Sequence, residues 1–249
     1  MFNDKHATTK RLLVFMLLTY LWCSTNLSAR DICPGYQGID FSDYTGKVNW
    51  TEVAKDTNIQ FVYLLATIGS DSINSAYQTY LSGARKTRLK AGAYHCMTST
   101  ATIDEQFQNF ISHVPKDSIK LVPMLYVSEC EYWTAEEVAD SVKYFCDLLE
   151  AHYGKKPVIY ALNAIYNRYL TPVFNDYALY IIKYSDVRPV IHGGNDGIRM
   201  LWQYTNKGKI RGIEKPVNLV KLWTARMLEL NMIVPKKIVV NHRPPTKRR

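Results

Sequence analysis

One strand-like segment ends in a loop where acid–base side chains would be expected, and it does not have them. The stretch LVPMLYVSECEYW, residues 121–133, has the pattern of a buried β-strand that runs into a loop. Tyr126 and Ser128 stand two positions apart and therefore point to the same side of such a strand. General acid–base catalysis mostly uses His, Glu or Asp side chains, and neither residue is one of these.

Other candidate functional residues stand at the ends of further strand-like segments. Asp40 ends the stretch YQGID and is the one acid among them, whereas the others are aromatic or polar. These others are Tyr94, His95, Tyr160, Trp202, Gln203 and Tyr204. Because parallel barrels gather functional groups at the carboxyl ends of their strands, we expect a ring of aromatic and polar groups with one carboxylate.

Each candidate also has a plainer interpretation. Asp40 is either a catalytic or ligand-positioning carboxylate, or a residue that organises the turn after its strand. His95 either binds a ligand or is a hydrogen-bonded core residue. The aromatic rings, with Trp202 the best candidate for a cleft wall, either stack on the apolar face of a ligand or pack in the core.

The elements that would position these residues alternate between strand-like and helix-like patterns. The strand-like runs, rich in β-branched and aromatic residues, are residues 60–69, 90–97, 156–162, 177–184 and 200–205. The clearest helix pattern covers residues 134–153. It opens with Thr134 and Glu137 in capping-box spacing and stops at Gly154.

This rhythm predicts an α/β fold, a TIM-like parallel (β/α) barrel with irregular or shortened final βα units. The length of 249 residues fits one such domain. We expect a signal peptide at residues 1–29, the barrel at 30–232, and a C-terminal extension with a disordered basic tail at 233–249.

Composition and charge exclude several function classes. The formal net charge is +9, but the basic residues are scattered except for Lys236, Lys237 and the terminal NHRPPTKRR. We therefore expect no nucleic-acid partner. The tail either contacts an anionic wall or membrane surface or is a solvated end. Zinc-type Cys/His spacing, a GxxxxGK[ST] loop and a GxGxxG loop are all absent, so we expect no metal and no other cofactor.

The first residues have the layout of a secretory signal. Lys5, Lys10 and Arg11 precede the apolar run LLVFMLLTYLWC, and small and polar residues follow it. We expect export to the periplasm or the extracellular space, and the alternative is a retained membrane anchor. The mature chain would keep four cysteines that either pair or are buried small hydrophobes: Cys33, Cys96, Cys130 and Cys146.

An ordered set of motifs resembles the glycoside hydrolase family 25 lysozymes. These motifs are GIDFSDYTGKVNW, FVYLLATIGS, RLKAGAYHCM, PMLYVS, KPVIYA and LWQYTNKGKIRGI, and together they span roughly residues 36–222. The resemblance implies an exported muramidase that cuts β-1,4 bonds between N-acetylmuramic acid and N-acetylglucosamine. Its partner would be peptidoglycan or a related amino-sugar glycan.

The chain departs from the family pattern where the family keeps its acids. The family strand that reads Pro, two apolar residues, Asp, apolar, Glu has Tyr126 and Ser128 here in place of both acids. Ile68 stands where the family has Glu, and Asn218 where it has a late Asp. Asp40 alone carries over as a catalytic candidate. We expect the substrate-binding surface to consist of Tyr94, His95, Tyr126, Ser128, Tyr160, Trp202, Tyr204 and Asn218.

Glu129 is the residue that would replace the missing acid. Strand alternation turns its side chain away from the barrel mouth, and only a bulge near Ser128 would bring it back. Glu131 is a second candidate on the same loop, or an ordinary solvated charge. Loss of a positioned general acid costs about 10²- to 10⁴-fold in rate.

Three functional hypotheses follow. The preferred one is a lysozyme-like exported protein that binds peptidoglycan glycan and is catalytically weak or inactive. The second is an active muramidase that uses Asp40 with Glu129. The third is a non-catalytic protein-interaction scaffold.

Overall fold

The computed structural model describes residues 35–41, 46–128, 133–193, 200–224 and 226–233. The strands are β1 (Gly38–Phe41), β2 (Phe61–Ile68), β3 (Ser72–Ile73), β4 (Lys90–Met97), β5 (Met124–Val127), β6 (Val158–Leu162), β7 (Ala178–Ile182), β8 (Met200–Gly208) and β9 (Val217–Leu222). The helices are α2 (Trp50–Val53), α3 (Tyr77–Arg85), α4 (Ile103–His113), α5 (Ala135–Tyr153), α6 (Asn163–Ile165), the π-helical η1 (Tyr166–Leu170) and α7 (Arg226–Leu230).

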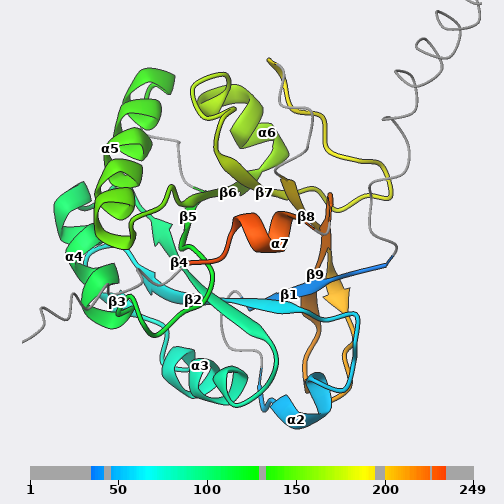
Figure 1. Ribbon diagram of the computed structural model, residues 1–249. Helices are drawn as coiled ribbons and strands as arrows, with labels where there is room; N and C mark the ends of the chain where they lie inside the picture. The colour runs from blue at the N-terminus through cyan, green and yellow to red at the C-terminus, as the bar shows by residue number, and fades with distance from the viewer. Residues whose placement is uncertain (1–34, 42–45, 129–132, 194–199, 225, 234–249) are drawn as a thin grey trace, which may run out of the picture.

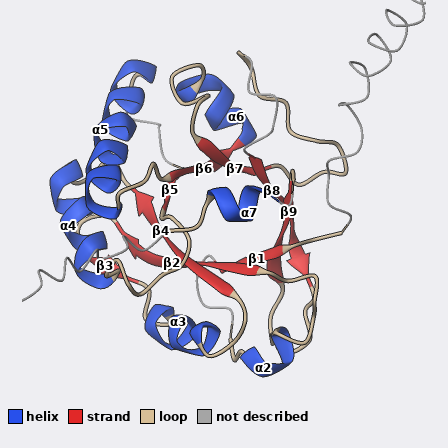
Figure 2. Cartoon of the chain, viewed as in Figure 1, coloured by secondary structure: helices blue, strands red, loops and turns tan. Residues whose placement is uncertain are grey.

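The strands form one closed barrel, which confirms the predicted α/β barrel fold (Figures 1 and 2). Eight of them follow the order β1-β9-β8-β7-β6-β5-β4-β2, and pairing of β1 with β2 closes the ring. All neighbours are parallel except β9, which runs antiparallel to both β1 and β8. The expectation of a wholly parallel barrel is therefore wrong for the last strand. The short segment 209–216 allows a hairpin and is too short for a crossover connection.

The helices on the outside of the barrel begin and end where the sequence indicates. Thr134 and Glu137 form the expected capping box of α5, and Gly154 ends the helix with a left-handed φ of 77°. After β6 the regular pattern stops, because α6 and η1 are short and residues 183–193 contain no helix. The predicted irregular final units are thus confirmed.

Two layers of core follow from strand alternation. On β2, Phe61 and Tyr63 point into the barrel, while Val62 and Leu64 pack outward against the helices. Met227 of α7 belongs to the inner cluster and helps to close the barrel at the end opposite the mouth, where the carboxyl ends of the parallel strands lie. Figure 2 shows α7 within the ring of strands.

Several predictions concern residues outside the described ranges and stay predictions. They include the signal peptide at 1–29, the basic tail, Cys33 and Cys130. Within the described part, no helix is both long and apolar enough to cross a membrane. Cys146 is buried in the outer core, and burial raises the pKa of its thiol far above the usual range.

Candidate functional site

Asp40 is the one carboxylate buried in the described part of the chain, with 1% of its surface exposed. Its Oδ2 accepts hydrogen bonds from the Tyr160 hydroxyl (3.1 Å) and from Nδ2 of Asn218 (3.1 Å). Asn218 reaches this place because β9 is antiparallel, which sets the start of β9 beside the end of β1. The other oxygen of Asp40, Oδ1, has no hydrogen-bond partner among the described residues.

Burial dominates the electrostatics of this carboxyl group. Loss of water raises the pKa of Asp40 to about 7, and hydrogen bonds from Asn218 and Tyr160 lower it only in part. The nearby Tyr180 hydroxyl also lowers the pKa of Asp40. This hydroxyl is buried, and its geometry does not complete a hydrogen bond with a described residue. At neutral pH the carboxyl group is therefore protonated in a large fraction of molecules.

A cluster of tyrosine rings covers Asp40. The Tyr126 ring stacks on the Tyr160 ring, with centroids 4.3 Å apart and planes 29° apart. Tyr94 and Tyr180 meet Tyr160 edge-on, at 5.4 and 4.4 Å. Because the Tyr160 hydroxyl binds Asp40, Tyr126 lies on the ring next to the carboxylate. An aromatic ring therefore packs into the site at the position where the resemblance implies an acid.

The other positions where the resemblance implies acids gather at the same end of the barrel. The Ser128 hydroxyl lies 3.7 Å from the Cys96 sulfur, and Cys96 and Ile68 pack against the inner cluster. Asn218 binds Asp40 directly. Glu129 and Glu131 lie outside the described residues, so the catalytic role of Glu129 stays a prediction. The described part contains no group of three or more His, Cys, Asp or Glu side chains that would hold a metal ion.

His95 lies outside the barrel, away from this cluster. Its Nδ1 is 2.8 Å from the Thr67 hydroxyl, and its Nε2 is 3.2 Å from Oε1 of Gln106. The ring packs against Phe110 and Phe145 in the outer core. Burial lowers the pKa of His95 to about 4, so the ring is neutral at pH 7. This placement favours the hydrogen-bonded core interpretation.

Trp202 and Tyr204 also lie on the outer side of their strand. Nε1 of Trp202 donates to the Lys183 carbonyl (2.8 Å), and the Lys221 ammonium group lies 5.0 Å from the Trp202 ring and 4.3 Å from the Tyr204 ring. Trp202 is 3% exposed. These contacts favour packing over a cleft wall for both aromatic residues.

Tyr180 and Tyr184 were missing from the predicted site, and Gln203 was predicted at a strand end but not among the binding residues. Gln203 points inward, where its Oε1 accepts from Tyr160 (2.8 Å) and its Nε2 donates to the Tyr184 hydroxyl (3.0 Å). Tyr180 is buried beside Asp40, and Tyr184 is 53% exposed. The signal for Gln203 was strand alternation, because it stands between two outward residues, Trp202 and Tyr204.

Comparison with known proteins gives a consistent result. The family model described as glycosyl hydrolases family 25 matches residues 39–213. The uncharacterized protein YegX of Escherichia coli K12 is 28% identical over 186 residues, which cover 73% of this chain and 67% of YegX. An autolytic lysozyme of Clostridium acetobutylicum is 25% identical over 183 residues, 74% of this chain and 54% of that protein.

Solved structures give the same fold. A family 25 glycosyl hydrolase from Bacillus anthracis superposes with a TM-score of 0.71 at 26% identity. The match covers 83% of this chain and 99% of that one. The family match at residues 39–213 includes Asp40 and the strands β2 to β8, and it ends before β9 and Asn218.

Proposed function

The chain belongs to glycosyl hydrolase family 25, and from this premise we propose an exported protein that binds peptidoglycan and cleaves it weakly or not at all. Membership supports a muramidase-like function on peptidoglycan in general. Membership of the family does not by itself support export or the loss of cleavage. The first is supported by the N-terminal signal pattern, and the second by the geometry around Asp40.

The observation that carries the proposal is the packing of Tyr126 on Tyr160. Glycoside hydrolysis needs one carboxyl group to protonate the leaving oxygen and a second group on the other side of the bond. Here the one buried carboxylate of the described part is enclosed by tyrosine rings, and a tyrosine and a serine occupy the positions of the acid pair. A Ser hydroxyl is not an effective proton donor near neutral pH.

The mouth keeps groups that suit sugar binding. Tyr126 is half-buried and Tyr184 is exposed, so both offer ring surface on which a pyranose can stack. The Tyr184 hydroxyl, held by Gln203, adds a hydrogen-bonding group beside that surface. This combination of aromatic surface and hydrogen-bonding groups supports binding without cleavage.

One observation favours the alternative of an active muramidase. A carboxyl group with a pKa of about 7 is suited to proton transfer, and Asp40 has that pKa. In this alternative Asp40 works with Glu129. The third hypothesis, a protein-interaction scaffold, predicts no glycan binding at all.

Two measurements on the mature protein separate these functions. Sedimentation with purified insoluble peptidoglycan measures binding, and mass spectrometry of the soluble fraction detects muropeptides with new N-acetylmuramic acid reducing ends. We expect binding that weakens in Tyr184→Ala, and few or no new ends. New ends that disappear in both Asp40→Asn and Glu129→Gln would establish the muramidase instead. Failure to bind, by protein with a native circular dichroism spectrum, would leave the scaffold hypothesis.

A further inference from the structure

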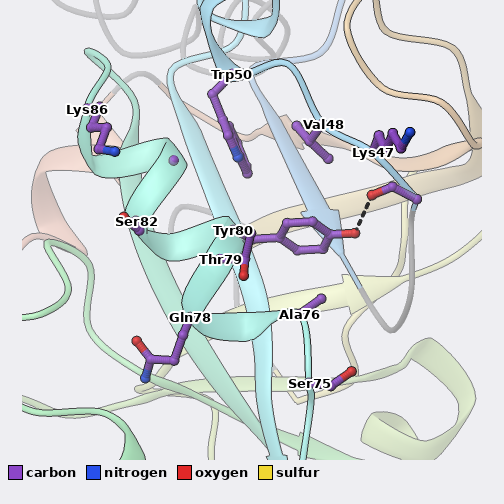
Figure 3. Close-up of a pocket in the computed structure, with 12 residues that line it drawn as sticks. Lys47, Val48, Trp50, Ser75, Ala76, Gln78, Thr79, Tyr80, Ser82 and Lys86 are labelled. Carbon is purple, nitrogen blue, oxygen red and sulfur yellow. Dashed lines mark hydrogen bonds between the residues drawn. The ribbon is translucent and has the colours of Figure 1, made fainter.

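Three adjoining hollows lie along α3, outside the barrel. The first, of about 1020 Å³, lies between α3 and residues 46–50 (Figure 3). It shares Gln78, Ser82 and Lys86 with a second hollow of about 270 Å³. That one shares Arg85 with a third of about 500 Å³. We call the surface that contains these three hollows the α3 groove.

The lining of the α3 groove is strongly cationic. Its charged lining residues are Lys47, Arg85, Lys86, Arg88, Lys90 and Lys120. The lining residues include no Asp or Glu, although Glu214 borders them at Gly46, and none of the six cations has an ion pair with a described residue. The Arg88 guanidinium donates to three backbone carbonyls, so its role is structural. The others are available to an anionic ligand.

The floor of the groove is well defined. Trp50 packs on Gly83 so closely that a Cβ at position 83 would lie 2.0 Å from the indole ring. The Tyr80 hydroxyl donates to the Gly46 carbonyl at 2.7 Å, which fixes residues 46–50 against the helix (Figure 3). Glu214 lies beside Gly46, and its Oε2 accepts from the Lys47 backbone N–H at 2.9 Å.

The groove has the length of a short peptide. α3 has 9 residues, and it leads from the mouth end of β2 to the start of β4 at the opposite end of the barrel. At 1.5 Å per residue the helix is about 14 Å long, and an extended peptide of about four residues spans the same distance. The groove begins at Gly46, which follows β1, the strand of Asp40.

We propose that the α3 groove binds a short acidic peptide of the kind attached to the glycan strands of peptidoglycan. This inference rests on the proposed function and makes it more specific, because the preferred ligand becomes glycan with its peptides rather than bare glycan. A glycan segment at the mouth directs its peptide along α3. The peptide carboxylates then meet Lys47, Lys86 and Arg85 in turn.

Calorimetric titration with two soluble glycan fragments tests this inference. One fragment keeps its peptides, and the other is the same fragment after an amidase has removed them. We expect the protein to bind the first about tenfold more tightly, as two exposed ion pairs within their usual range of strength would give. The double variant Arg85→Glu/Lys86→Glu should lose this preference and keep its affinity for the stripped fragment.

The matched control is Lys207→Glu/Lys209→Glu, which makes the same change in charge at exposed residues outside the groove lining. It should keep the preference, and Lys47→Glu, at the other end of the groove, should reduce it. Equal affinity of the unmodified protein for both fragments overturns the inference. Equal losses in the two double variants also overturn it, because general charge would then explain binding. Binding to neither fragment overturns the proposed function itself.

Discussion

Asp40 and His95 are both buried titratable residues of this barrel, and the protein holds them in different ways. Asp40, on the inner face, has two donors on Oδ2 and none on Oδ1 among the described residues. His95, on the outer face, has a partner on each ring nitrogen. Burial favours the neutral form of both, since the pKa of Asp40 rises to about 7 and that of His95 falls to about 4.

Asp40 and His95 are similarly buried, and they differ in how many of their polar atoms have hydrogen-bond partners. On the outer face both ring nitrogens of His95 are bonded, whereas the buried Tyr77 hydroxyl there has no described partner. The inner face leaves Oδ1 of Asp40 and the Tyr180 hydroxyl without described partners. Unused hydrogen-bonding capacity on a buried carboxyl group therefore distinguishes Asp40 from His95.

The largest expected effect comes from returning the acids to the inner face. We expect Tyr126→Asp combined with Ser128→Glu to release muropeptides at least about 10²-fold faster than the unmodified protein, because a positioned general acid contributes about 10²- to 10⁴-fold. The rate is measured by mass spectrometry of digested peptidoglycan. The control, Tyr126→Asp with Ser128→Gln, has nearly the same shape and lacks only the carboxyl group at position 128. Equal rates in the two variants would show that the inner face no longer positions a sugar.

The next effect is on the pH dependence of stability, through Asp40. Its pKa is raised from 3.8 to about 7 on folding, so the folded state holds a proton that the unfolded state has lost. Stability therefore falls as pH rises from about 4 to about 7, by up to about 4 kcal/mol. We expect Asp40→Asn to lack this decrease. Urea denaturation between pH 5 and 8 should show the variant gaining stability over the unmodified protein as pH rises.

His95 should give the opposite slope. Its pKa is lowered from 6.5 to about 4, so the unfolded state binds the proton in this window and stability rises with pH, by about 3 kcal/mol. His95→Gln, measured in the same urea series, should lose stability relative to the unmodified protein as pH rises from 5 to 6.5. Slopes of the same sign in the two variants would contradict the comparison.

The smallest expected effect is the change in the free energy of unfolding when one hydroxyl is removed from each face of the barrel. Thr67→Val removes a partner of His95 and should cost about 1–2 kcal/mol, because a buried ring nitrogen loses its hydrogen bond. Tyr180→Phe removes a buried hydroxyl that completes no hydrogen bond with a described residue, and should change the free energy of unfolding by less than about 1 kcal/mol. Thermal denaturation at one pH is sufficient. A larger loss in Tyr180→Phe would reverse the assignment of the two faces.

The sequence was a good guide to the fold because local signals there agree with the tertiary structure. The capping box at Thr134 and the stop at Gly154 are local, and both appear where the pattern put them. The direction of β9 was not predictable in the same way, because both faces of these strands are buried and the apolar run VNLVKL has no directional signal.

The candidate site was predicted only in part, because type and spacing do not say which face of a strand is inside. Tyr94 and His95 are adjacent, so only one of them can point inward, and it is Tyr94 that joins the inner cluster. For the same reason, Gln203 points into the barrel and its neighbour Trp202 points outward. Asn218 entered the set through the family resemblance, and its contact with Asp40 depends on the antiparallel β9.

The seam between β1 and β9 has a consequence for the order of folding. The hydrogen bond from Asn218 to Asp40 joins residues 178 positions apart, whereas most other strand neighbours are close in the sequence. Contacts of such long range form late, because a long loop must first be ordered. Asp40 therefore loses its water only when the ring of strands closes, and near pH 6 it then takes up a proton. A pH-indicator dye in a refolding experiment would record that proton as the signal that the last strand has docked.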